Sequence, residues 1–331
     1  MSTIRDVARL ANVSVATVSR VLNGTAKVSD KAREAVLRAR EELGFHLNAN
    51  AKALAQQESE TIGVLVSDVS DPYFGTMVRS CEEVAQHHGK VLLVAQGFHE
   101  PEREMRAINS LISRQCSGLI IHALALSDEL FAKYMKEFPF MVLVNRILPG
   151  FEDRCVNINN KRGMYLAVRE LTNAGRRRIA YISSSHPILD ADERYEGYLQ
   201  ALDEAGIEPD PDLVIAVPPY LESGFEAAKR ILKLGGVDGL ACYNDALASA
   251  AMSTFTREGV KVPEDISVVG FDDLPFGKCL TPPLTTVTNP IEIMGRCATE
   301  LSLSLYSGEP YTLPEIETRV IRRESIAPKK P

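Results

Sequence analysis

The sequence lacks any run of apolar residues as long as the ~18 that a membrane-spanning helix needs, so we expect no membrane-embedded segment. The first ten residues, MSTIRDVARL, carry charges at Arg5 and Asp6 and have no apolar stretch before a cleavage site, unlike a secretory signal. The six cysteines are far apart, without the paired spacing of a zinc site or a redox pair. These absences predict a cytoplasmic protein with mostly buried cysteines and no metal.

The short motifs of several enzyme classes are missing as well. No glycine-rich dinucleotide motif follows the first predicted strand, and neither a P-loop, a G-x-S-x-G elbow nor an H-E-x-x-H pair occurs in the chain. The six histidines are scattered, and only His87 and His88 are adjacent. The sequence therefore predicts no cofactor and no catalytic residue, and it gives none of the histidines a catalytic role.

Charge is unevenly distributed along the 331 residues. The net charge is −7, yet residues 1–57 contain nine Lys and Arg against five Asp and Glu, which gives this segment +4 and the remainder −11. A basic segment on an acidic chain indicates that this segment alone meets a polyanion. The length of the chain predicts two or three structural units.

The basic segment contains signals for three short helices. Thr3 and Asp6 form a capping box for a helix over about 4–11, while Ser14 and Ser29 are placed to cap a second and a third helix. The apolar positions of the first helix are expected to face the core: Ile4, Val7, Ala8, Leu10 and Ala11. The tight turn between the first two helices predicts a helix-turn-helix, whose second helix enters the DNA major groove.

The helical wheel assigns two faces to the second helix. Val18, Val21 and Leu22 form its buried stripe. The exposed face and its rims consist of Val15, Ala16, Thr17, Ser19, Arg20 and Asn23. Arginine can donate two hydrogen bonds to guanine, hydroxyl and amide groups suit phosphate oxygens, and small apolar side chains can meet a thymine methyl group. The alternative is the solvated face of a small amphipathic hairpin.

Residues 48–57, NANAKALAQQ, follow the third helix. They are mostly alanine and too few to form a stable helix alone. Leu54 is the one large apolar side chain in this stretch. A leucine in such a place is either a packing residue, a chance feature of a linker or part of a binding surface.

From Thr61 onward, short apolar runs alternate with helical stretches. We expect strands at 61–68, 90–96, 118–123, 140–146, 155–159, 178–184, 212–217, 239–244 and 266–273. Continuous apolar strands between helices are typical of parallel sheets that are covered on both faces. The number of strands predicts two open α/β halves of Rossmann-like winding, with a seam near 155–165.

Polar residues stand at the carboxyl ends of several of these strands. They are Ser67–Asp68, Asn145–Arg146, Asn244–Asp245 and Asp272–Asp273, and Arg194 lies in a further polar stretch, DERYEG. Ligands of open α/β sheets bind beyond the carboxyl ends of the strands. The pattern indicates a cleft built for a ligand with many hydroxyl groups. The alternative is that these residues are polar only because they lie in loops.

Several longer motifs occur along the chain. Near the N-terminus these are IRDVARLANVSVATVSRVLN and NANAKALA. They are followed by DVSDPYFG, GLIIHA, ERYEGY, YNDALASAAM, VPEDISVVGFDD, PPLTTV and TRVIRRES. In this order, and over nearly the whole chain, they resemble the lactose/galactose repressor family of bacterial transcription regulators. The stretch LVNRILPGFEDRC is most similar to the galactose repressor and isorepressor subgroup.

The resemblance implies a small all-α helix-turn-helix head and an α/β body of two Rossmann-like subdomains, like type I periplasmic binding proteins. The implied parts are a DNA-binding head over 1–46, a hinge over 47–60 that is helical on operator DNA, and an effector-binding and dimerisation body over 61–331. The lobes of the body cover about 61–160 with a C-terminal return, and about 161–290. The chain ends in RRESIAPKKP without leucine heptads, so a homodimer is expected.

The resemblance also implies DNA contacts at individual positions. The base-reading positions of the family correspond to Val15, Ala16 and Arg20. Its other DNA-contacting positions correspond to Thr3, Ser14, Thr17, Ser19, Asn23, Asn48 and Ala51, with Thr17, Ser19 and Asn23 on phosphates. Leu54 corresponds to the side chain that enters the minor groove at the centre of a palindromic double-stranded operator and kinks it.

In the body, the resemblance places the ligand cleft at Asp71, Tyr73, Phe74, Asn145, Arg146, Asp190, Arg194, Tyr220, Asn244 and Asp272. Carboxylates and amides that bind ring hydroxyls, with aromatic rings against the sugar face, suit a neutral sugar such as D-galactose. Where several relatives have an aromatic residue before an E-S-G turn, this chain has Pro219 with Tyr220 beside it. The alternatives are another sugar or a nucleoside as effector, a sugar-binding transport receptor, and a sugar-converting enzyme.

Replacing Leu54 by alanine is expected to weaken operator binding and to leave sugar affinity unchanged, because the role implied for this side chain is in the minor groove. Gel-shift titration with a palindromic operator and calorimetric titration with the sugar measure the two affinities separately. An equal loss of both affinities would contradict this role of Leu54.

Overall fold

The computed structural model describes residues 2–23, 28–45 and 59–329. The chain forms two compact units, Met1–Glu58 and Ser59–Pro331, which we call the head and the body. The boundary between them lies inside the predicted hinge 47–60. Among the described residues, no helix combines the length and the apolar character needed to cross a bilayer.

The head contains the three predicted helices, α1 (Ile4–Leu10), α2 (Val15–Asn23) and α3 (Asp30–Glu42). At the start of α1, the Asp6 carboxylate accepts a hydrogen bond from the Thr3 amide at 2.9 Å, and the Thr3 hydroxyl accepts one from the Asp6 amide. Ser14 and Ser29 accept the corresponding backbone bonds at α2 and α3. The capping residues expected from the sequence are therefore confirmed.

The core of the head is small. It consists of Val7, Ala8, Val18, Val21, Val36 and Ala39. Leu10, in contrast, is 46% exposed, so the expectation that it faces the core is wrong. Leu10 follows Ala8 by two residues, which places its side chain about 200° around the helix from that buried position.

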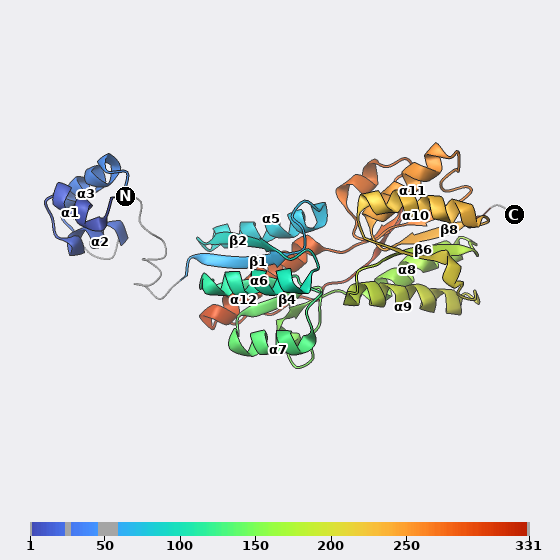
Figure 1. Ribbon diagram of the computed structural model, residues 1–331, viewed down its shortest axis with the longest axis horizontal. Coiled ribbons are helices and arrows are strands. Elements are labelled where there is room, and N and C mark those ends of the chain that lie inside the picture. The colour runs from blue at the N-terminus through green and yellow to red at the C-terminus, as the bar shows by residue number, and fades with distance from the viewer. Residues whose placement is uncertain (1, 24–27, 46–58, 330–331) are drawn as a thin grey trace. The chain divides into compact units, whose positions relative to one another are not determined.

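The first lobe of the body is built on a parallel five-stranded sheet in the order β2-β1-β3-β4-β5. Its strands are β1 (Thr61–Val66), β2 (Val91–Gln96), β3 (Gly118–Ile121), β4 (Met141–Val144) and β5 (Cys155–Val156). The two faces are covered by α5 (Pro72–His87) with α12 (Ile291–Ser307), and by α6 (Pro101–Ser113) with α7 (Asp128–Glu137) (Figure 1). Val64 and Val66 pack toward the first pair of helices and Leu65 toward the second, as expected for a sheet buried on both faces.

The second lobe repeats this winding in a parallel sheet of order β7-β6-β8-β9. Its strands are β6 (Ile179–Ser184), β7 (Val214–Val217), β8 (Gly239–Cys242) and β9 (Ser267–Val269). Its helices are α8 (Asn160–Asn173) and α9 (Leu189–Glu204) on one face and α10 (Leu221–Leu234) and α11 (Asp245–Arg257) on the other (Figure 1). In both lobes the first strand lies between the second and the third, which confirms the predicted Rossmann-like halves.

The C-terminal part of the chain ties the lobes together. After β10 (Thr286–Val287), α12 returns to the first lobe, where Ser302 Oγ donates to the Phe140 carbonyl and accepts from the Leu119 amide. The chain then pairs with β10 again through β11 (Val320–Ile321). Ser325 bonds to the backbone of Val268 and Thr285 in the second lobe. The return was expected from the sequence, but the second crossing back after α12 was not.

Helices α8 and α9 touch through their backbones at Gly197. A Cβ atom on this residue would lie 2.2 Å from the carbonyl oxygen of Lys161 and 2.9 Å from the amide nitrogen of Tyr165. Only glycine permits this approach, because any side chain would collide with main-chain atoms that have no room to move. The contact fixes the position of α9 one turn beyond Arg194.

Replacing Gly197 by alanine is expected to destabilise the body by about 1–3 kcal/mol, because the added methyl group must push α8 and α9 apart. Gly75 of α5 provides a matched control, since a Cβ there meets nothing closer than 3.7 Å and alanine favours the helix. Thermal unfolding of the two variants should give a lower melting temperature for Gly197→Ala and an equal or higher one for Gly75→Ala. Equal melting temperatures would contradict the close packing.

Candidate functional site

The first candidate surface is the outer face of α2. Its side chains are the exposed Val15, Ala16 and Arg20 and the half-buried Thr17 and Ser19. Val18 and Val21 are buried on the opposite side, so the two faces agree with the helical wheel. An exposed valine 42% open to solvent at the start of a helix has no packing role there, and it is available to a binding partner.

Hydroxyl groups organise the N-terminal end of this face. Ser14 Oγ accepts a hydrogen bond from the Thr17 amide at 3.1 Å and lies 2.9 Å from the Thr17 hydroxyl oxygen. The first N–H groups of an α-helix point out of its N-terminal end, and this end of a helix suits an anion such as a phosphate group. The side chain of Asn23 and the residues Asn48, Ala51 and Leu54 lie outside the described part of the chain.

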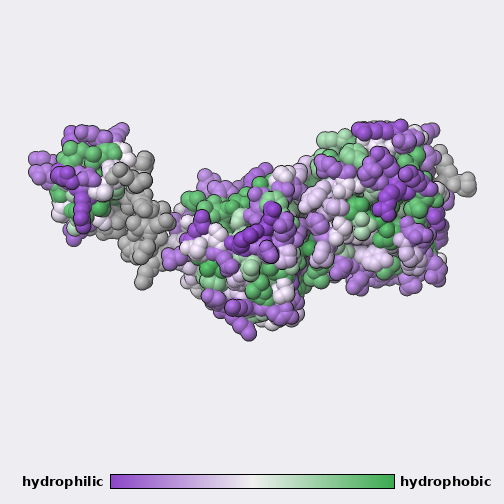
Figure 2. All heavy atoms as spheres, in the orientation of Figure 1, coloured by the Kyte–Doolittle hydropathy of each residue, from purple (hydrophilic) through white to green (hydrophobic). Residues whose placement is uncertain are grey.

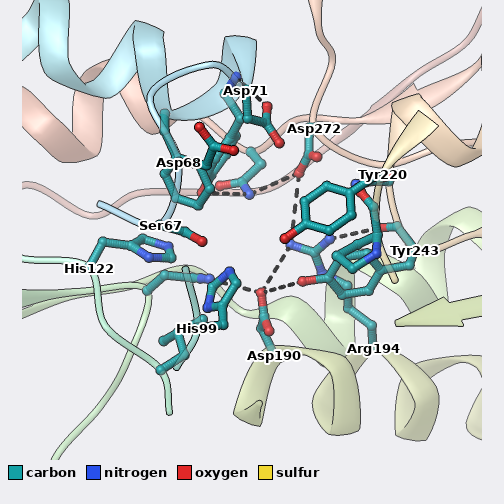
Figure 3. A pocket seen from close by; sticks show the side chains of 17 residues that line it. Ser67, Asp68, Asp71, His99, His122, Asp190, Arg194, Tyr220, Tyr243 and Asp272 are labelled. Atoms are coloured by element: carbon teal, nitrogen blue, oxygen red, sulfur yellow. Dashed lines mark hydrogen bonds and ion pairs between the residues drawn. The ribbon is translucent and has the colours of Figure 1, made fainter. Parts of the chain in front are cut away.

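The second candidate site is a cavity in the body, between the carboxyl ends of strands from both lobes (Figure 3). It contains about 530 Å³ of space that protein atoms leave free, part of it open to solvent. Nine of the ten predicted ligand residues line it: Asp71, Tyr73, Phe74, Asn145, Asp190, Arg194, Tyr220, Asn244 and Asp272. Polar groups that converge at the carboxyl ends of parallel strands are typical of a small-molecule site.

Arg194 of α9 is the central side chain of this cavity, and only 2% of it is exposed. Its guanidinium group lies 3.8 Å from a carboxylate oxygen of Asp190 and 3.8 Å from one of Asp272. It also donates to the Tyr243 carbonyl at 2.7 Å and stacks 3.8 Å from the centroid of the Phe271 ring. A buried cation requires such partners, and they leave Arg194 in a single orientation.

Asp190 connects the two lobes. Its Oδ2 accepts hydrogen bonds from Asn145 Nδ2 at 3.0 Å and from the Tyr243 hydroxyl at 2.9 Å. Asn145 belongs to the first lobe, at the end of β4, and Asp190 to the first turn of α9 in the second. Asp190 Oδ1 is buried and has no hydrogen-bond partner among the described residues, so it can accept one from a ligand.

Asp272 is held in an uncommon backbone conformation. Its φ is 111°, which L-residues rarely adopt, and its amide donates to the Val287 carbonyl. Its carboxylate accepts from Asn289 Nδ2 at 3.0 Å, and the same nitrogen lies 3.0 Å from the Tyr73 hydroxyl. Burial raises the pKa of Asp272 to about 7, against the opposing effect of Arg194. Asn289 Oδ1 is buried without a partner in the described chain.

The polar residues that follow Asn244 and Asp272 face away from the cavity. Asp245 is fully buried, where it accepts from the Leu274 amide and the Thr286 hydroxyl. Asp273 pairs with Arg323. These two carboxylates therefore hold the loop after β9, which carries Asp272 into the cavity.

Arg146 is the predicted ligand residue that does not line the cavity. Its guanidinium group pairs with Asp128 and stacks 4.7 Å from the centroid of the Phe131 ring. Asn145, the preceding residue, has a φ of 58° and turns into the cavity. The two neighbouring side chains therefore point to different surroundings, and only that of Asn145 belongs to the site.

Of the other wall residues, Ser67 and Asp68 were expected from their place at a strand end, and Pro219 was named beside Tyr220. Sequence analysis missed the remaining five: His99, His122, Leu124, Tyr243 and Asn289. His99 and His122 each lie shortly after a strand, β2 and β3, which is the signal that identified the other residues. His186, after β6, contacts His99, with ring centroids 5.2 Å apart. The scattering of the histidines along the sequence concealed that three of them meet in space.

The cavity is suited to binding a neutral polar molecule. Asp190 and Asn289 offer buried acceptors, and Tyr73, Phe74 and Tyr220 supply aromatic surface. In the described part of the chain, no group of three His, Cys, Asp or Glu side chains has a metal-binding arrangement. The geometry thus supports recognition through hydrogen bonds and ring contacts.

Comparison with known proteins links these sites to a family. Residues 3–48 match the bacterial regulatory proteins of the lacI family, and residues 168–326 match a periplasmic binding protein-like domain. The chain is 46% identical over 332 aligned residues to the HTH-type transcriptional regulator GalR of Escherichia coli (strain K12), covering 99% of this chain and 96% of that protein.

Two solved structures extend the comparison to the fold. The lac repressor dimer bound to operator and the anti-inducer ONPF has a TM-score of 0.85 at 27% identity, over 98% of this chain and 99% of that one. The transcriptional regulator CelR in complex with cellobiose has a TM-score of 0.70 at 31% identity, over 98% of this chain and 100% of that one. The chain therefore belongs to the lacI family of bacterial regulatory proteins, as a DNA-binding transcriptional regulator of the GalR type.

Proposed function

We propose that this regulator is a homodimeric repressor of sugar-utilisation genes, and that a neutral sugar resembling D-galactose in the body cavity controls its binding to palindromic operator DNA. The observation that carries the sugar assignment is the set of buried polar atoms in the cavity wall that have no partner among the described residues: Asp190 Oδ1, Asn289 Oδ1, His99 Nδ1 and both ring nitrogens of His122. Sugar hydroxyls both donate and accept hydrogen bonds, so a polyol can satisfy donors and acceptors together.

Charge argues against an anionic effector. Among the seventeen side chains of the wall, Arg194 carries the only permanent positive charge, and Asp190 and Asp272 already pair with it. Asp68 and Asp71 add further acidic groups. A phosphate or carboxylate group would therefore enter a site of net negative charge, which disfavours sugar phosphates relative to free sugars.

The proposed control acts through the angle between the lobes. Ligand groups that bind Asp190 and Asn145 contact both lobes at once, so an occupied cavity favours one interlobe angle over another. The first lobe begins with β1 at Thr61, directly after the predicted hinge 47–60. A changed angle would move the starting points of the two hinge segments in a dimer, and so change operator affinity.

The dimer is proposed to form at the edge of the first sheet. Strand β2 is at the end of the strand order, and Val91 and Val94 are 61% and 42% exposed. Figure 2 shows a hydrophobic area over the part of the first lobe where Figure 1 places α5 and β2. Apolar surface on an edge strand favours contact with a second copy.

Two alternative functions are disfavoured. A transport receptor would not need the DNA-binding head that residues 3–48 form. An enzyme is disfavoured because the relatives are transcriptional regulators, which supports a cytoplasmic protein that binds its sugar without converting it.

The decisive experiment is a panel of hexoses, pentoses, sugar phosphates and nucleosides in thermal-shift assays, followed by gel shifts on operator DNA. A panel in which no sugar stabilises the protein or changes operator binding would contradict the proposal.

Replacing Asp190 by asparagine is expected to weaken sugar binding about 10- to 100-fold, because a hydrogen bond to a charged group contributes roughly 1.5–3 kcal/mol. Asp192 of the same helix is exposed and gives a matched control, Asp192→Asn, with unchanged affinity. Calorimetric titration with D-galactose measures both affinities. Wild-type affinity in Asp190→Asn would exclude Asp190 from the binding site.

Replacing Arg20 by alanine is expected to reduce operator affinity by about 1–3 kcal/mol and to relax the base preference at one position per half-site. Arg38 is exposed on a different helix, α3, and Arg38→Ala serves as the control. Selection from a randomised palindromic library gives the base preference of each variant. Uniform weakening across all sequences would instead make Arg20 a phosphate contact.

A further inference from the structure

Three histidines from separate parts of the chain meet at the cavity. His99 follows β2 and His122 follows β3, both in the first lobe, while His186 follows β6 in the second. The ring centroids of His99 and His122 are 6.4 Å apart, and those of His99 and His186 are 5.2 Å apart. We call these residues the histidine group.

His122 is buried in an aromatic setting. It is 3% exposed, with its ring edge-on to Phe74 at 4.9 Å and to Tyr73 at 6.3 Å between centroids. Figure 3 shows its ring entering the cavity from the side of Ser67. A phenylalanine could fill this place without polar atoms, so packing alone does not account for an imidazole.

The hydrogen-bonding capacity of His122 is unused within the described protein. Neither Nδ1 nor Nε2 has a partner among the described residues, and both atoms are buried. A neutral imidazole carries one N–H donor and one acceptor nitrogen. Burying both without partners is unfavourable, and a ligand hydroxyl group can satisfy each of them.

His99 extends the same pattern toward the second lobe. Its ring contacts those of both His122 and His186, and its Nδ1 is also buried without a partner in the described chain. A hydroxyl group bound at His99 therefore sits where residues of the two lobes meet. His186 in turn contacts Tyr220, with ring centroids 5.9 Å apart, so the group continues to the aromatic edge of the cavity.

The histidine group is uncharged near neutral pH. Burial lowers the pKa of His122 and of His99 to about 4, and the charges that face them are Asp190, which opposes this shift for both, and Arg194, which adds to it for His122. Burial also lowers the pKa of His186. Neutral imidazoles bind hydroxyl groups without attracting anions, which matches the acidic remainder of the wall.

We propose that His122 and His99 are effector-binding, specificity-determining residues that hydrogen-bond individual hydroxyl groups of the sugar. This inference rests on the proposed sugar-binding function and adds the residues that distinguish one hydroxyl configuration from another. Asp190 and Asn289 bind the ligand from the second lobe and from the segment after β10, whereas His122 and His99 bind it from the first lobe.

The test uses the full-length protein, D-galactose and its monodeoxy analogues in calorimetric titrations. His122→Phe keeps the aromatic volume and removes both nitrogens, and it is expected to weaken D-galactose binding about 10- to 100-fold. The analogue that lacks the hydroxyl group bound by His122 should then bind wild type and His122→Phe with equal affinity. His87→Phe, at an exposed position of α5, is the matched control with unchanged binding.

Two further variants distinguish binding from packing. His122→Asn and His122→Gln keep one polar nitrogen near Nδ1 or Nε2, and one of them should recover part of the affinity lost in His122→Phe. If D-galactose binds wild type and His122→Phe equally, or if all three variants weaken every analogue by the same factor, the inference is overturned while the sugar-binding function stands. If no monosaccharide binds wild type, both fail.

Discussion

The ligand cavity depends on a single buried guanidinium group. Arg194 is enclosed between the Asp190 and Asp272 carboxylates and the faces of Phe271 and Tyr243. A charge removed from water in this way is stable only if its partners stay in place. Three elements must therefore keep one arrangement: the helix that carries Arg194, the loop that carries Asp272 and the strand end before Tyr243. Together they form the second-lobe wall of the cavity.

Side-chain hydrogen bonds join the first lobe to this network. Asn145 donates to Asp190 and accepts from Asn160, and Asn289 joins Tyr73 to Asp272. These bonds involve side chains rather than sheet backbone, so in the proposed function a ligand that engages them would act on both lobes at once. The proposed control through the interlobe angle would act at this boundary between the two lobes.

The fold was largely predictable from the sequence because its signals are local. Capping residues such as Thr3 and Ser14 and the apolar runs of the strands depend on neighbours a few residues away. The site was predictable where a residue directly ends a strand or belongs to a specific motif, as with Asn145 and Asp272. The meeting of His99 with His122 was not, because it depends on how two separate loops leave the sheet. The direction of Arg146 was missed because the backbone turns at Asn145, whose φ of 58° the sequence does not reveal.

The proposed DNA-reading surface of the head is small, and this limits the number of base pairs that one copy can specify. On α2, the proposed base-reading residues Val15 and Ala16 have small side chains that can offer only apolar contact, while Arg20 can supply a strong polar donor. Three such side chains discriminate few base pairs. A second head on the same DNA doubles the number of bases read and adds a fixed half-site spacing, so the proposed dimer is a requirement of specificity as well as of control. In this proposal, an effector that alters the separation of the two heads would prevent them from binding both half-sites together, and most of the sequence specificity would be lost.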